Sequence, residues 1–367
     1  MRGVLAGALL VILAILAACT DGTKPGAGGM TIVWTAPART SGGEWVNGAP
    51  ASEAGRVYFQ EGNELLARDA ATGALLWARP VRHAPSPPPT TLLARDGRVY
   101  LSETDSVMAI DGATGHTIWT MHPDSQAVVA PALDATTLYT GQRGLPVVYA
   151  LDLSSGAVRW RVNIGTGFTF PALVEGIAVR GDTAYVTMQR NFDRNGAASA
   201  GVLVALATSD GHELWRYETT SHQADFRDAP ILTDRLVIVN EFTPGNLLAI
   251  DIGTHQLAWQ SPVGGAQGMV RIGNVIVSAG VDAQVHAVDI ATGASLWTGP
   301  TGSSAFGAGA CGGSAFASSI LLRRFDLGTG VVTGEISGGN WISQIATDGT
   351  RAFVAGSAGS LAVLCDH

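Results

Sequence analysis

Short apolar runs alternate with glycine-containing polar turns along almost the whole chain. In residues 150–160, for example, an apolar run ends at Asp152, the residues Ser-Ser-Gly follow, and Val158 begins a second run. An aspartate at this position can accept hydrogen bonds from backbone N–H groups two or three residues further on, and glycine adopts the positive φ that a tight turn requires. The pattern therefore predicts two antiparallel strands joined by a tight turn.

The same phrase recurs six times with one fixed spacing. A tryptophan stands eight residues after the aspartate position in every copy, and the fourth copy has Ala207 in place of the acid. Successive tryptophans lie 42, 41, 55, 44 and 38 residues apart. A repeat of about 40 residues forms one small sheet that cannot bury its own faces, so the copies are expected to stack into a ring or a solenoid.

Each repeat also contains a second hairpin upstream of the phrase, as in residues 97–111 and 274–289. The second hairpin brings the number of strands in a repeat to four. Four strands in about 40 residues, with a tryptophan at a fixed place, are typical of a β-propeller blade. Helical periodicity is absent outside the extreme N-terminus, which disfavours a helical array.

The two ends of the chain set the number of blades. A seventh repeat has Gly334 where the tryptophan is expected, and an eighth ends at His367, just after its third strand. Residues 30–38 can supply the missing fourth strand, because their Trp34 lies 43 residues, one repeat length, before the first tryptophan of the series. We therefore predict an all-β, eight-bladed β-propeller of four-stranded antiparallel blades over residues 30–367, with the last blade closed by the N-terminal strand.

The phrase AxDxxTGxxxW, repeated around an eight-bladed ring, resembles the tryptophan-docking repeat of the pyrroloquinoline-quinone (PQQ) type propellers. The resemblance covers essentially all of the chain after its N-terminal segment. It implies that each tryptophan stacks between neighbouring blades, which is a structural role. The residues to which it gives this role are Trp34, Trp77, Trp119, Trp160, Trp215, Trp259 and Trp297.

The first residues predict export and a lipid anchor. Arg2 precedes an uncharged apolar stretch, residues 4–18, and small residues lead up to Cys19. The sequence Leu-Ala-Ala-Cys is similar to the bacterial lipoprotein box, which implies a signal peptide at 1–18 and a diacylglycerol on the Cys19 thiol. Residues 19–29 are polar and glycine-rich and are predicted to form a flexible tether. An ordinary signal peptide with an incidental cysteine is the alternative.

Composition and charge limit the classes of partner that we expect the protein to bind. Hydrophobic residues make up 46% of the chain and charged residues 14%, and 47 glycines fit a turn-rich sheet protein. The formal net charge of −8 disfavours nucleic acid and anionic membrane surfaces, so contact with the lipid bilayer is expected through the acyl anchor. Because Thr20 and not aspartate follows the cysteine, the resemblance implies the periplasmic face of the outer membrane in a cell with two membranes. In other cells it implies the outer face of the cell membrane.

Residues suited to catalysis or metal binding are sparse. The eight histidines are scattered, and no pair has the short spacing of a preorganised zinc site, so we predict no metal site and no catalytic residue. A PQQ-dependent dehydrogenase, or another propeller that binds a small molecule in its central pocket, is the alternative function. The resemblance to such enzymes implies adjacent cysteines against the cofactor, whereas Cys311 and Cys365 are far apart in sequence. We expect no cofactor.

The repeat class, the lipoprotein box, the length and the missing cofactor cysteines together resemble the BamB-type lipoproteins of the outer-membrane β-barrel assembly machinery. That resemblance implies a non-catalytic, membrane-anchored scaffold that binds another envelope protein, most concretely an outer-membrane barrel assembly protein, through interblade loops of one face.

The 55-residue gap between two of the tryptophans marks a candidate for such a loop. Its extra residues, 189–201, contain polar turn formers that an ordinary hairpin does not need. These candidate partner-binding residues are Asn191, Asp193, Arg194 and Asn195. A neutral insertion accounts for the gap equally well. Residues 222–230, which are acidic and aromatic, are a weaker candidate near the central axis.

The two cysteines of the propeller are predicted to form a disulfide. Alignment of the repeats places Cys311 in the turn between the first and second strands of blade 7, and Cys365 in the turn after the third strand of blade 8. Both turns face the same side of the ring, the blades are neighbours, and the compartment is oxidising. Two separate core residues are the alternative, because the α-carbons of such turns can lie farther apart than the roughly 7 Å that a disulfide spans.

Overall fold

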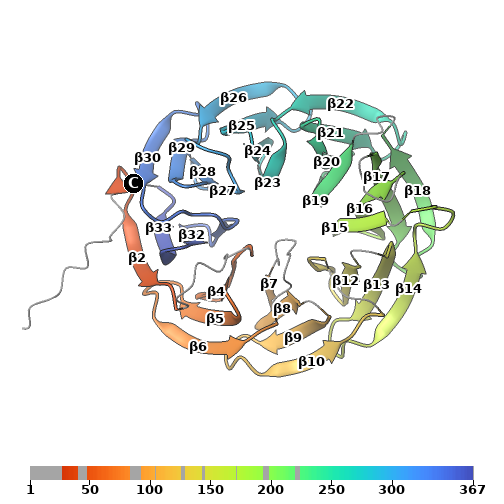
Figure 1. Ribbon diagram of the computed structural model, residues 1–367, viewed down its shortest axis with the longest axis horizontal. Coiled ribbons are helices and arrows are strands. Elements are labelled where there is room, and N and C mark those ends of the chain that lie inside the picture. Colours follow the sequence, from red (N-terminus) through yellow and green to blue (C-terminus); the bar gives the residue numbers. More distant parts are fainter. Residues whose placement is uncertain are drawn as a thin grey trace, which may run out of the picture.

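The computed structural model describes residues 27–39, 48–82, 92–103, 105–124, 129–142, 145–170, 172–192, 198–219 and 224–366. Over these residues the chain forms strands and no helix, and the strands make eight sheets around a central axis (Figure 1). The structure confirms the predicted all-β, eight-bladed propeller. Within the same described ranges, no helix is long and apolar enough to cross a membrane.

The blades follow one another in chain order, and in each blade consecutive strands pair antiparallel from the axis to the rim. Blade 1 contains β3 (Ala51–Glu53), β4 (Arg56–Glu61), β5 (Glu64–Asp69) and β6 (Leu75–Pro80); blade 2 contains β7 (Leu93–Arg95), β8 (Arg98–Ser102), β9 (Val107–Asp111) and β10 (Thr117–Met121). Blade 3 contains β11 (Ala132–Leu133), β12 (Thr137–Gly141), β13 (Val147–Asp152) and β14 (Val158–Asn163); blade 4 contains β15 (Ala172–Arg180), β16 (Thr183–Asn191), β17 (Ser199–Ala207) and β18 (Glu213–Glu218).

The second half of the ring repeats this arrangement. Blade 5 contains β19 (Asp225–Leu232), β20 (Leu236–Thr243), β21 (Asn246–Asp251) and β22 (Leu257–Pro262); blade 6 contains β23 (Ala266–Ile272), β24 (Val275–Gly280), β25 (Gln284–Asp289) and β26 (Ser295–Pro300). Blade 7 contains β27 (Gly307–Cys311), β28 (Ser314–Ser318), β29 (Leu322–Asp326) and β30 (Val332–Ile336); blade 8 contains β31 (Ala346–Thr347), β32 (Arg351–Gly356), β33 (Gly359–Leu364) and β2 (Ile32–Pro37).

The turn after the third strand has the predicted aspartate-centred geometry. In blade 2, Asp111 Oδ1 accepts hydrogen bonds from the N–H of Ala113 at 3.1 Å and from the N–H and hydroxyl of Thr114, both at 2.8 Å. The bond from the Thr114 hydroxyl is the largest cause that holds the pKa of Asp111 below its ordinary value. The charged carboxylate therefore locks the reversal that carries the chain from the third strand to the fourth.

Each tryptophan docks on the aspartate turn of the next blade. The indole N–H of Trp119 in blade 2 donates to the carbonyl oxygen of Leu153 in blade 3 at 3.1 Å. The ring lies against Gly156, where a Cβ atom would come within 2.6 Å of it, so only glycine fits under the indole. Equivalent N–H bonds to the following blade are made by Trp34, Trp77, Trp160 and Trp297.

One turn departs from glycine at this position. Blade 5 has His255, which adopts a φ of 60° and stacks its imidazole on Trp215 of blade 4, with ring centroids 4.7 Å apart and an interplanar angle of 16°. The ring of His255 thus extends the contact sideways over the indole. The ring of the remaining tryptophan, Trp259, lies against Gly293 of blade 6, but its buried indole N–H has no hydrogen-bond partner among the described residues.

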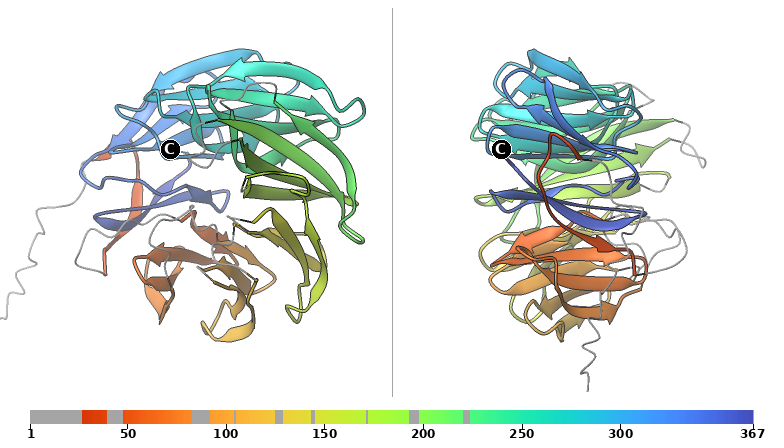
Figure 2. Two further views of the ribbon diagram at one scale, coloured as in Figure 1. Left: turned by 45° about the vertical axis from the view of Figure 1, so that its right-hand side comes forward. Right: turned by 90° about the vertical axis from the view of Figure 1, so that its left-hand side faces the viewer.

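The N-terminal strand closes the ring as predicted. Strand β2 pairs antiparallel with β33, with Trp34 opposite Ala362, and forms the outer strand of blade 8. Figure 2 shows β2, in orange-red, beside the last strands, in dark blue. Both ends of the propeller are therefore held in one sheet, and the ring has no open seam.

The propeller begins earlier than predicted. Strand β1 (Ala27–Gly28) pairs with β30 and adds a fifth strand to blade 7, although it lies in the segment 19–29 that was expected to be a flexible tether. Gly334, which stands at the tryptophan position of blade 7, leaves room for this approach: a Cβ on Gly29 would lie 3.5 Å from the Gly334 Cα and 2.5 Å from a β30 carbonyl oxygen. Glycine at both positions therefore lets the N-terminal segment lie on the sheet.

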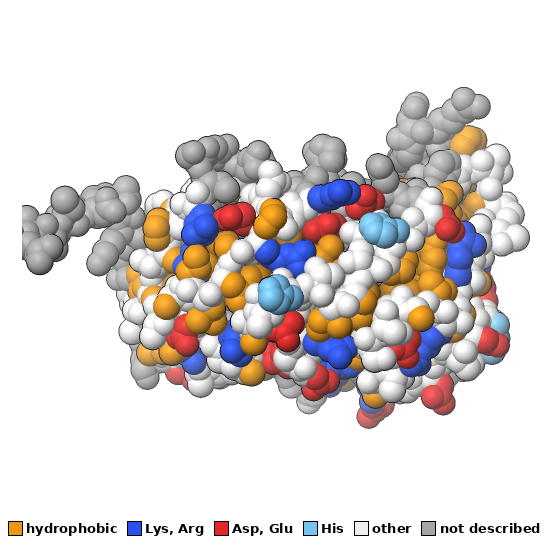
Figure 3. All heavy atoms as spheres, turned by 90° about the horizontal axis from the view of Figure 1, so that it is seen from below, with side chains coloured by type: hydrophobic (Ala, Val, Ile, Leu, Met, Phe, Trp, Pro, Cys, Tyr) orange, Lys and Arg blue, Asp and Glu red, His pale blue; other side chains and the backbone are white. Residues whose placement is uncertain are grey.

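The buried core is divided into eight hydrophobic clusters, one between each pair of adjacent blades. Exposed aliphatic side chains stand at the start of most outer strands, for example Leu76 and Ile118. On the side of the ring that Figure 3 shows, hydrophobic side chains are interspersed with acidic and basic ones. Scattered aliphatic residues of this kind are ordinary on a folded surface.

Candidate functional site

The two faces of the ring carry different loops. In an antiparallel meander, the connections between blades and the hairpins between second and third strands lie on one face, which we call the connector face. The aspartate turns and the hairpins between first and second strands lie on the other, the turn face. Apart from Ala207 and His255, the aspartate turns share one sequence pattern because they hold the tryptophans, so most variation that could recognise a partner belongs to the connector face.

Blade 4 has the longest hairpin on the connector face. Strands β16 and β17 have nine residues each and stay paired as far as Asn191 opposite Ser199. Of the residues predicted as a loop at 189–201, residues 189–191 and 199–201 are thus an extension of the two strands. Of the predicted partner-binding residues, Asn191 ends β16 and accepts a hydrogen bond from Gln189 Nε2 at 3.1 Å.

The other predicted residues of this hairpin, Asp193, Arg194 and Asn195, lie outside the described part of the chain, and so does the predicted lipid acceptor Cys19.

A cationic and aromatic cluster supports the base of this hairpin. The guanidinium of Arg190 lies over two rings, 4.5 Å from the centroid of Phe168 and 4.9 Å from that of Phe192, and pairs with both oxygens of Glu218 at 2.8 and 3.0 Å. Phe168 comes from the connection between blades 3 and 4, so the cluster ties this connection to the hairpin. Because arginine and aromatic side chains dominate the binding energy of many interfaces, the cluster is a candidate contact site.

The described part of the second candidate, residues 224–230, lies near the axis as expected. Asp225 begins the inner strand β19 and accepts hydrogen bonds from the N–H of Thr243 at 3.0 Å and from Arg227 Nε at 2.8 Å. The Arg227 guanidinium also lies 3.5 Å from the centroid of Phe242. The next residue, Asp228, faces the axial pocket.

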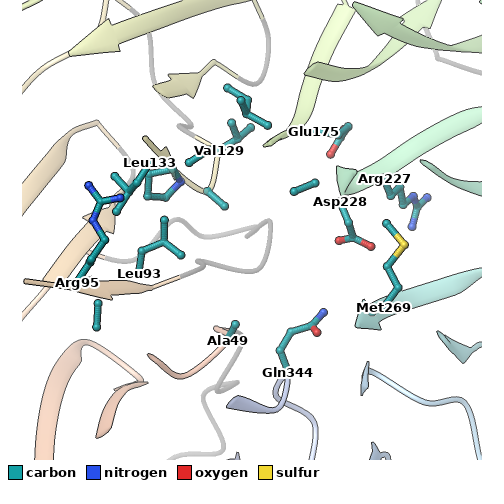
Figure 4. A pocket seen from close by; sticks show the side chains of 17 residues that line it. Ala49, Leu93, Arg95, Val129, Leu133, Glu175, Arg227, Asp228, Met269 and Gln344 are labelled. Carbon is teal, nitrogen blue, oxygen red and sulfur yellow. The ribbon is translucent and has the colours of Figure 1, made fainter. Parts of the chain in front are cut away.

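The axial pocket has a volume of about 650 Å³. It is lined by the inner strands of blades 2 to 6 and by the connection into blade 8, from which Gln344 reaches the cavity. Figure 4 shows Glu175 and Asp228 on one side of the cavity and Leu93 and Leu133 on the other. The pocket is within the size range of small-molecule sites.

The sequence matches the family described as outer membrane protein assembly factor BamB over residues 27–169 and 146–312. The chain belongs to the BamB family. The match begins at β1 and ends in the turn after β27, so it takes in six whole blades. Among curated proteins, none has a matching sequence.

Solved structures with the same fold include both members of the BamB family and enzymes. BamB from Moraxella catarrhalis superposes with a TM-score of 0.68 at 14% identity and covers 91% of this chain and 99% of its own. Quinohemoprotein alcohol dehydrogenase from Comamonas testosteroni superposes with a TM-score of 0.70 at 13% identity, over 93% of this chain and 77% of its own. The computationally designed protein Ika8 gives 0.68 at 15% identity, over 93% and 98%. At these identities the likeness is one of fold.

The described cysteines of this BamB-family chain lie away from the axial pocket. The described cysteines, Cys311 and Cys365, are bonded to each other with sulfurs 1.97 Å apart, between blades 7 and 8, and neither lines the pocket. In the described ranges no group of three histidine, cysteine or acidic side chains could hold a metal ion. The side chains of Glu175 and Asp228 are among those that line the cavity.

Two features of the site were not predicted from the sequence. The cluster around Arg190 joins residues from a connection and from a hairpin, which no local motif links. Glu175 did leave a signal, because it is an acid inside the otherwise apolar run of β15, at a position that a buried strand normally fills with an aliphatic residue. Its place next to Asp228 follows only from the contact between blades.

Proposed function

We propose that this chain is a non-catalytic, membrane-anchored scaffold that binds another envelope protein through its connector face, as an accessory of outer-membrane protein assembly. The observation that carries the proposal is the extended hairpin of blade 4, whose base presents the cluster of Arg190, Phe168 and Phe192. Membership of the BamB family supports an assembly role. The position of the Cys311–Cys365 disulfide between blades 7 and 8, away from the axial pocket, gives no support to the dehydrogenase alternative.

The partner is to be captured from the native envelope by crosslinking, with wild type compared with Arg190→Ala. We expect the loss of the guanidinium to reduce the captured partner by about tenfold, because a central arginine can contribute 2 kcal/mol or more to an interface. Arg159→Ala is the matched control: Arg159 also pairs with a carboxylate, Asp152 at 2.7 Å, but on the turn face. Equal capture by wild type and Arg190→Ala, or equal loss in both variants, contradicts docking at this cluster.

The anchor requires a separate experiment. If Cys19 carries the acyl group, wild-type protein partitions into the detergent phase, whereas Cys19→Ala is neither acylated nor processed as a lipoprotein. Mass spectrometry of the N-terminal peptide checks the modification directly. Wild-type protein in the aqueous phase refutes lipidation without affecting the proposal of a docking face.

A further inference from the structure

The N-terminal segment joins the propeller beside one hairpin of blade 7. Ala27 of β1 is paired with Ile336 of β30, and Ile336 is paired with Leu322 of β29. Because neighbouring strands lie about 4.8 Å apart, Ala27 is about 10 Å from Leu322. Leu322 directly follows residues 319–321, which form the connector-face hairpin between β28 and β29 and which we call the blade 7 tip. The chain therefore enters the ring next to this tip.

Contacts inside the seam hold the N-terminal segment at this place. Arg324 Nη2 donates to the carbonyl oxygen of Gly29 at 2.7 Å, and Met30 is buried between blades 7 and 8. Cys19 precedes Ala27 by eight residues. Even a fully extended chain of this length cannot span more than about 29 Å. If Cys19 carries the proposed acyl anchor, on which this inference rests, the connector edge of blade 7 stays within that distance of the lipid.

The blade 7 tip presents an aliphatic side chain on a well-held turn. Ile320, its middle residue, is 50% exposed. The buried Ser319 Oγ donates to the carbonyl oxygen of Thr301 at 3.0 Å and accepts from the N–H of Leu321 at 3.0 Å. The N–H of Ser319 donates to the Leu321 carbonyl oxygen at 2.7 Å. These polar groups on either side of Ile320 are paired within the protein, which lowers the cost of moving the tip into a less polar medium.

The surface around the tip is uncharged. The connections that enter blades 7 and 8, and the hairpins between the second and third strands of these blades, contain no charged residue; they are residues 301–306, 319–321, 337–345 and 357–358. The corresponding hairpins of blades 1, 2, 5 and 6 carry acidic residues, namely Glu61, Asp105, Glu241 and Asp282.

The charged residues of the neighbouring strands are paired with each other. Arg323 and Glu335, which lie opposite one another on β29 and β30, form an ion pair at 2.8 Å. The chain as a whole has a formal net charge of −8, so most of its surface is poorly suited to a lipid bilayer. The edge at blades 7 and 8 can approach lipid without burying an unpaired charge.

We propose that the blade 7 tip is a second membrane contact, in which Ile320 inserts into the surface of the bilayer that holds the anchor. Three observations favour lipid as the occupant: the short distance to the anchor, the absence of charge in the four segments around the tip, and the exposed aliphatic side chain. Blade 3 lies opposite blade 7 in the ring (Figure 1). Contact at blade 7 alone therefore tilts the connector face and leaves the extended hairpin of blade 4 clear of lipid for the proposed protein partner.

Spin labels on Ile320→Cys and Leu145→Cys test the contact. Leu145 is the matched control, because it is 42% exposed and belongs to the connector-face hairpin of the opposite blade, between β12 and β13. Cys311 and Cys365 are bonded to each other and Cys19 is blocked by acylation, so the introduced cysteine is the reactive thiol. The acylated protein is reconstituted into phosphatidylcholine vesicles, and flotation checks that it is bound to them.

Electron paramagnetic resonance then measures how often each label collides with oxygen, which concentrates in lipid, and with a water-soluble nickel chelate. We expect the ratio of oxygen to nickel collisions to be several-fold higher at position 320 than at position 145. Both side chains are about half exposed, so melting temperatures close to that of the wild type are expected.

A third label tests the native isoleucine. Ala358→Cys places it on the exposed hairpin of blade 8, next to the tip. With this label in place, Ile320→Asp should raise collisions with the nickel chelate, because a charged side chain cannot enter the lipid at low cost, whereas Leu145→Asp should leave them unchanged.

Several outcomes would overturn the proposal. Labels at 320 and 145 that are equally exposed to water show that the acyl chains alone hold the protein, and labels that are equally exposed to lipid show that the connector face lies flat on the bilayer. A label at 320 that is shielded from nickel in native envelope membranes but not in lipid vesicles indicates a protein at the tip. Protein that fails to float with the vesicles lacks the anchor, and the inference then fails with it, while docking at the cluster of Arg190 is still tested by the capture experiment.

Discussion

The interface between blades 2 and 3 and the interface between blades 7 and 8 are held together by different residues. Between blades 2 and 3, Trp119 docks on the aspartate turn of the next blade and donates to the Leu153 carbonyl oxygen. Between blades 7 and 8 the tryptophan position is Gly334, and the N-terminal segment lies there. Met30 enters the core between these two blades, together with the disulfide of Cys311 and Cys365.

The seam between blades 7 and 8 is also held by a buried arginine. Arg324 is 1% exposed, and its Nη2 donates to the carbonyl oxygen of Gly29 at 2.7 Å. Burial lowers the pKa of this guanidinium from its ordinary value. A regular interface thus needs only residues of the repeated phrase, whereas the seam is built from residues that do not belong to that phrase. The seam therefore joins the two ends of the propeller, whereas the regular interfaces join successive repeats.

The largest effect is expected from removing the strand that closes the ring. Deletion of residues 30–38 removes the outer strand of blade 8, the docked Trp34 and the buried Met30. We expect the free energy of unfolding to fall by about 5 kcal/mol or more, since loss of one buried tryptophan alone costs about 3–5 kcal/mol. Urea denaturation measures the loss, and a synthetic peptide of residues 27–39 added in trans should restore part of it. An unchanged urea midpoint would show that β2 does not close the ring.

The disulfide is the next largest contribution at the seam. Cys311 and Cys365 are 54 residues apart in sequence, and a crosslink of this span stabilises a protein by about 4 kcal/mol on chain-entropy grounds. The double variant Cys311→Ala/Cys365→Ala should lose about that amount, and reduction of the wild type should give the same loss. Two thiols that can be alkylated in the non-reduced, unfolded protein would contradict the bond.

The regular interfaces could be predicted from the sequence, and the seam only in part. The aspartate, the turn glycine and Trp119 are local and repeated, so their spacing specifies both the hairpin and the contact to the next blade. The pairing of β1 was missed because residues 19–29 have the composition of a linker, and the space that receives residues 27–29 is defined by Gly334, about 300 residues later. Composition alone cannot show that two distant glycines permit one contact.

The candidate site was less predictable than the fold. The excess residues at 189–201 were recognised, but their continuation as strand up to Asn191 depends on pairing with Ser199. The axial pocket draws residues from the inner strands of five blades, two or three from each of them, so no short motif marks it. Residues gathered from separate repeats become a site only once the ring has closed.

A smaller, pH-dependent effect is expected at the junction of blades 8 and 1. The carboxylate of Glu61 is buried, with the residue only 1% exposed. Burial raises its pKa above the ordinary value of 4.5, although the positive charge of Arg68 opposes the shift. The contribution of Glu61 to stability is therefore fully present below pH 4.5 and is lost as pH rises through the raised folded-state pKa.

Glu61→Gln should consequently gain stability relative to wild type as pH rises above about 4.5, and the gain should level off above the folded-state pKa. Urea midpoints measured between about pH 4 and pH 8 check this, with Asp182→Asn, on the exposed turn of blade 4, as the control expected to follow the wild-type curve. If the difference in urea midpoint between Glu61→Gln and wild type is constant over this range, or has the opposite sign, burial does not raise the pKa of Glu61.

The smallest effect is expected at the one regular interface that lacks the turn glycine. His255 gains a stacked contact with Trp215 but holds a φ of 60°, which costs about 1 kcal/mol for a residue other than glycine. An aromatic stack is worth about 0.5–1.5 kcal/mol, so the gain and the cost nearly cancel, and His255→Gly should lie within about 1 kcal/mol of wild type. His255→Ala keeps the unfavourable φ and loses the stack, so it should be less stable than His255→Gly by about 1 kcal/mol. If the alanine variant is as stable as the glycine variant, backbone conformation does not decide what residue stands under the tryptophan.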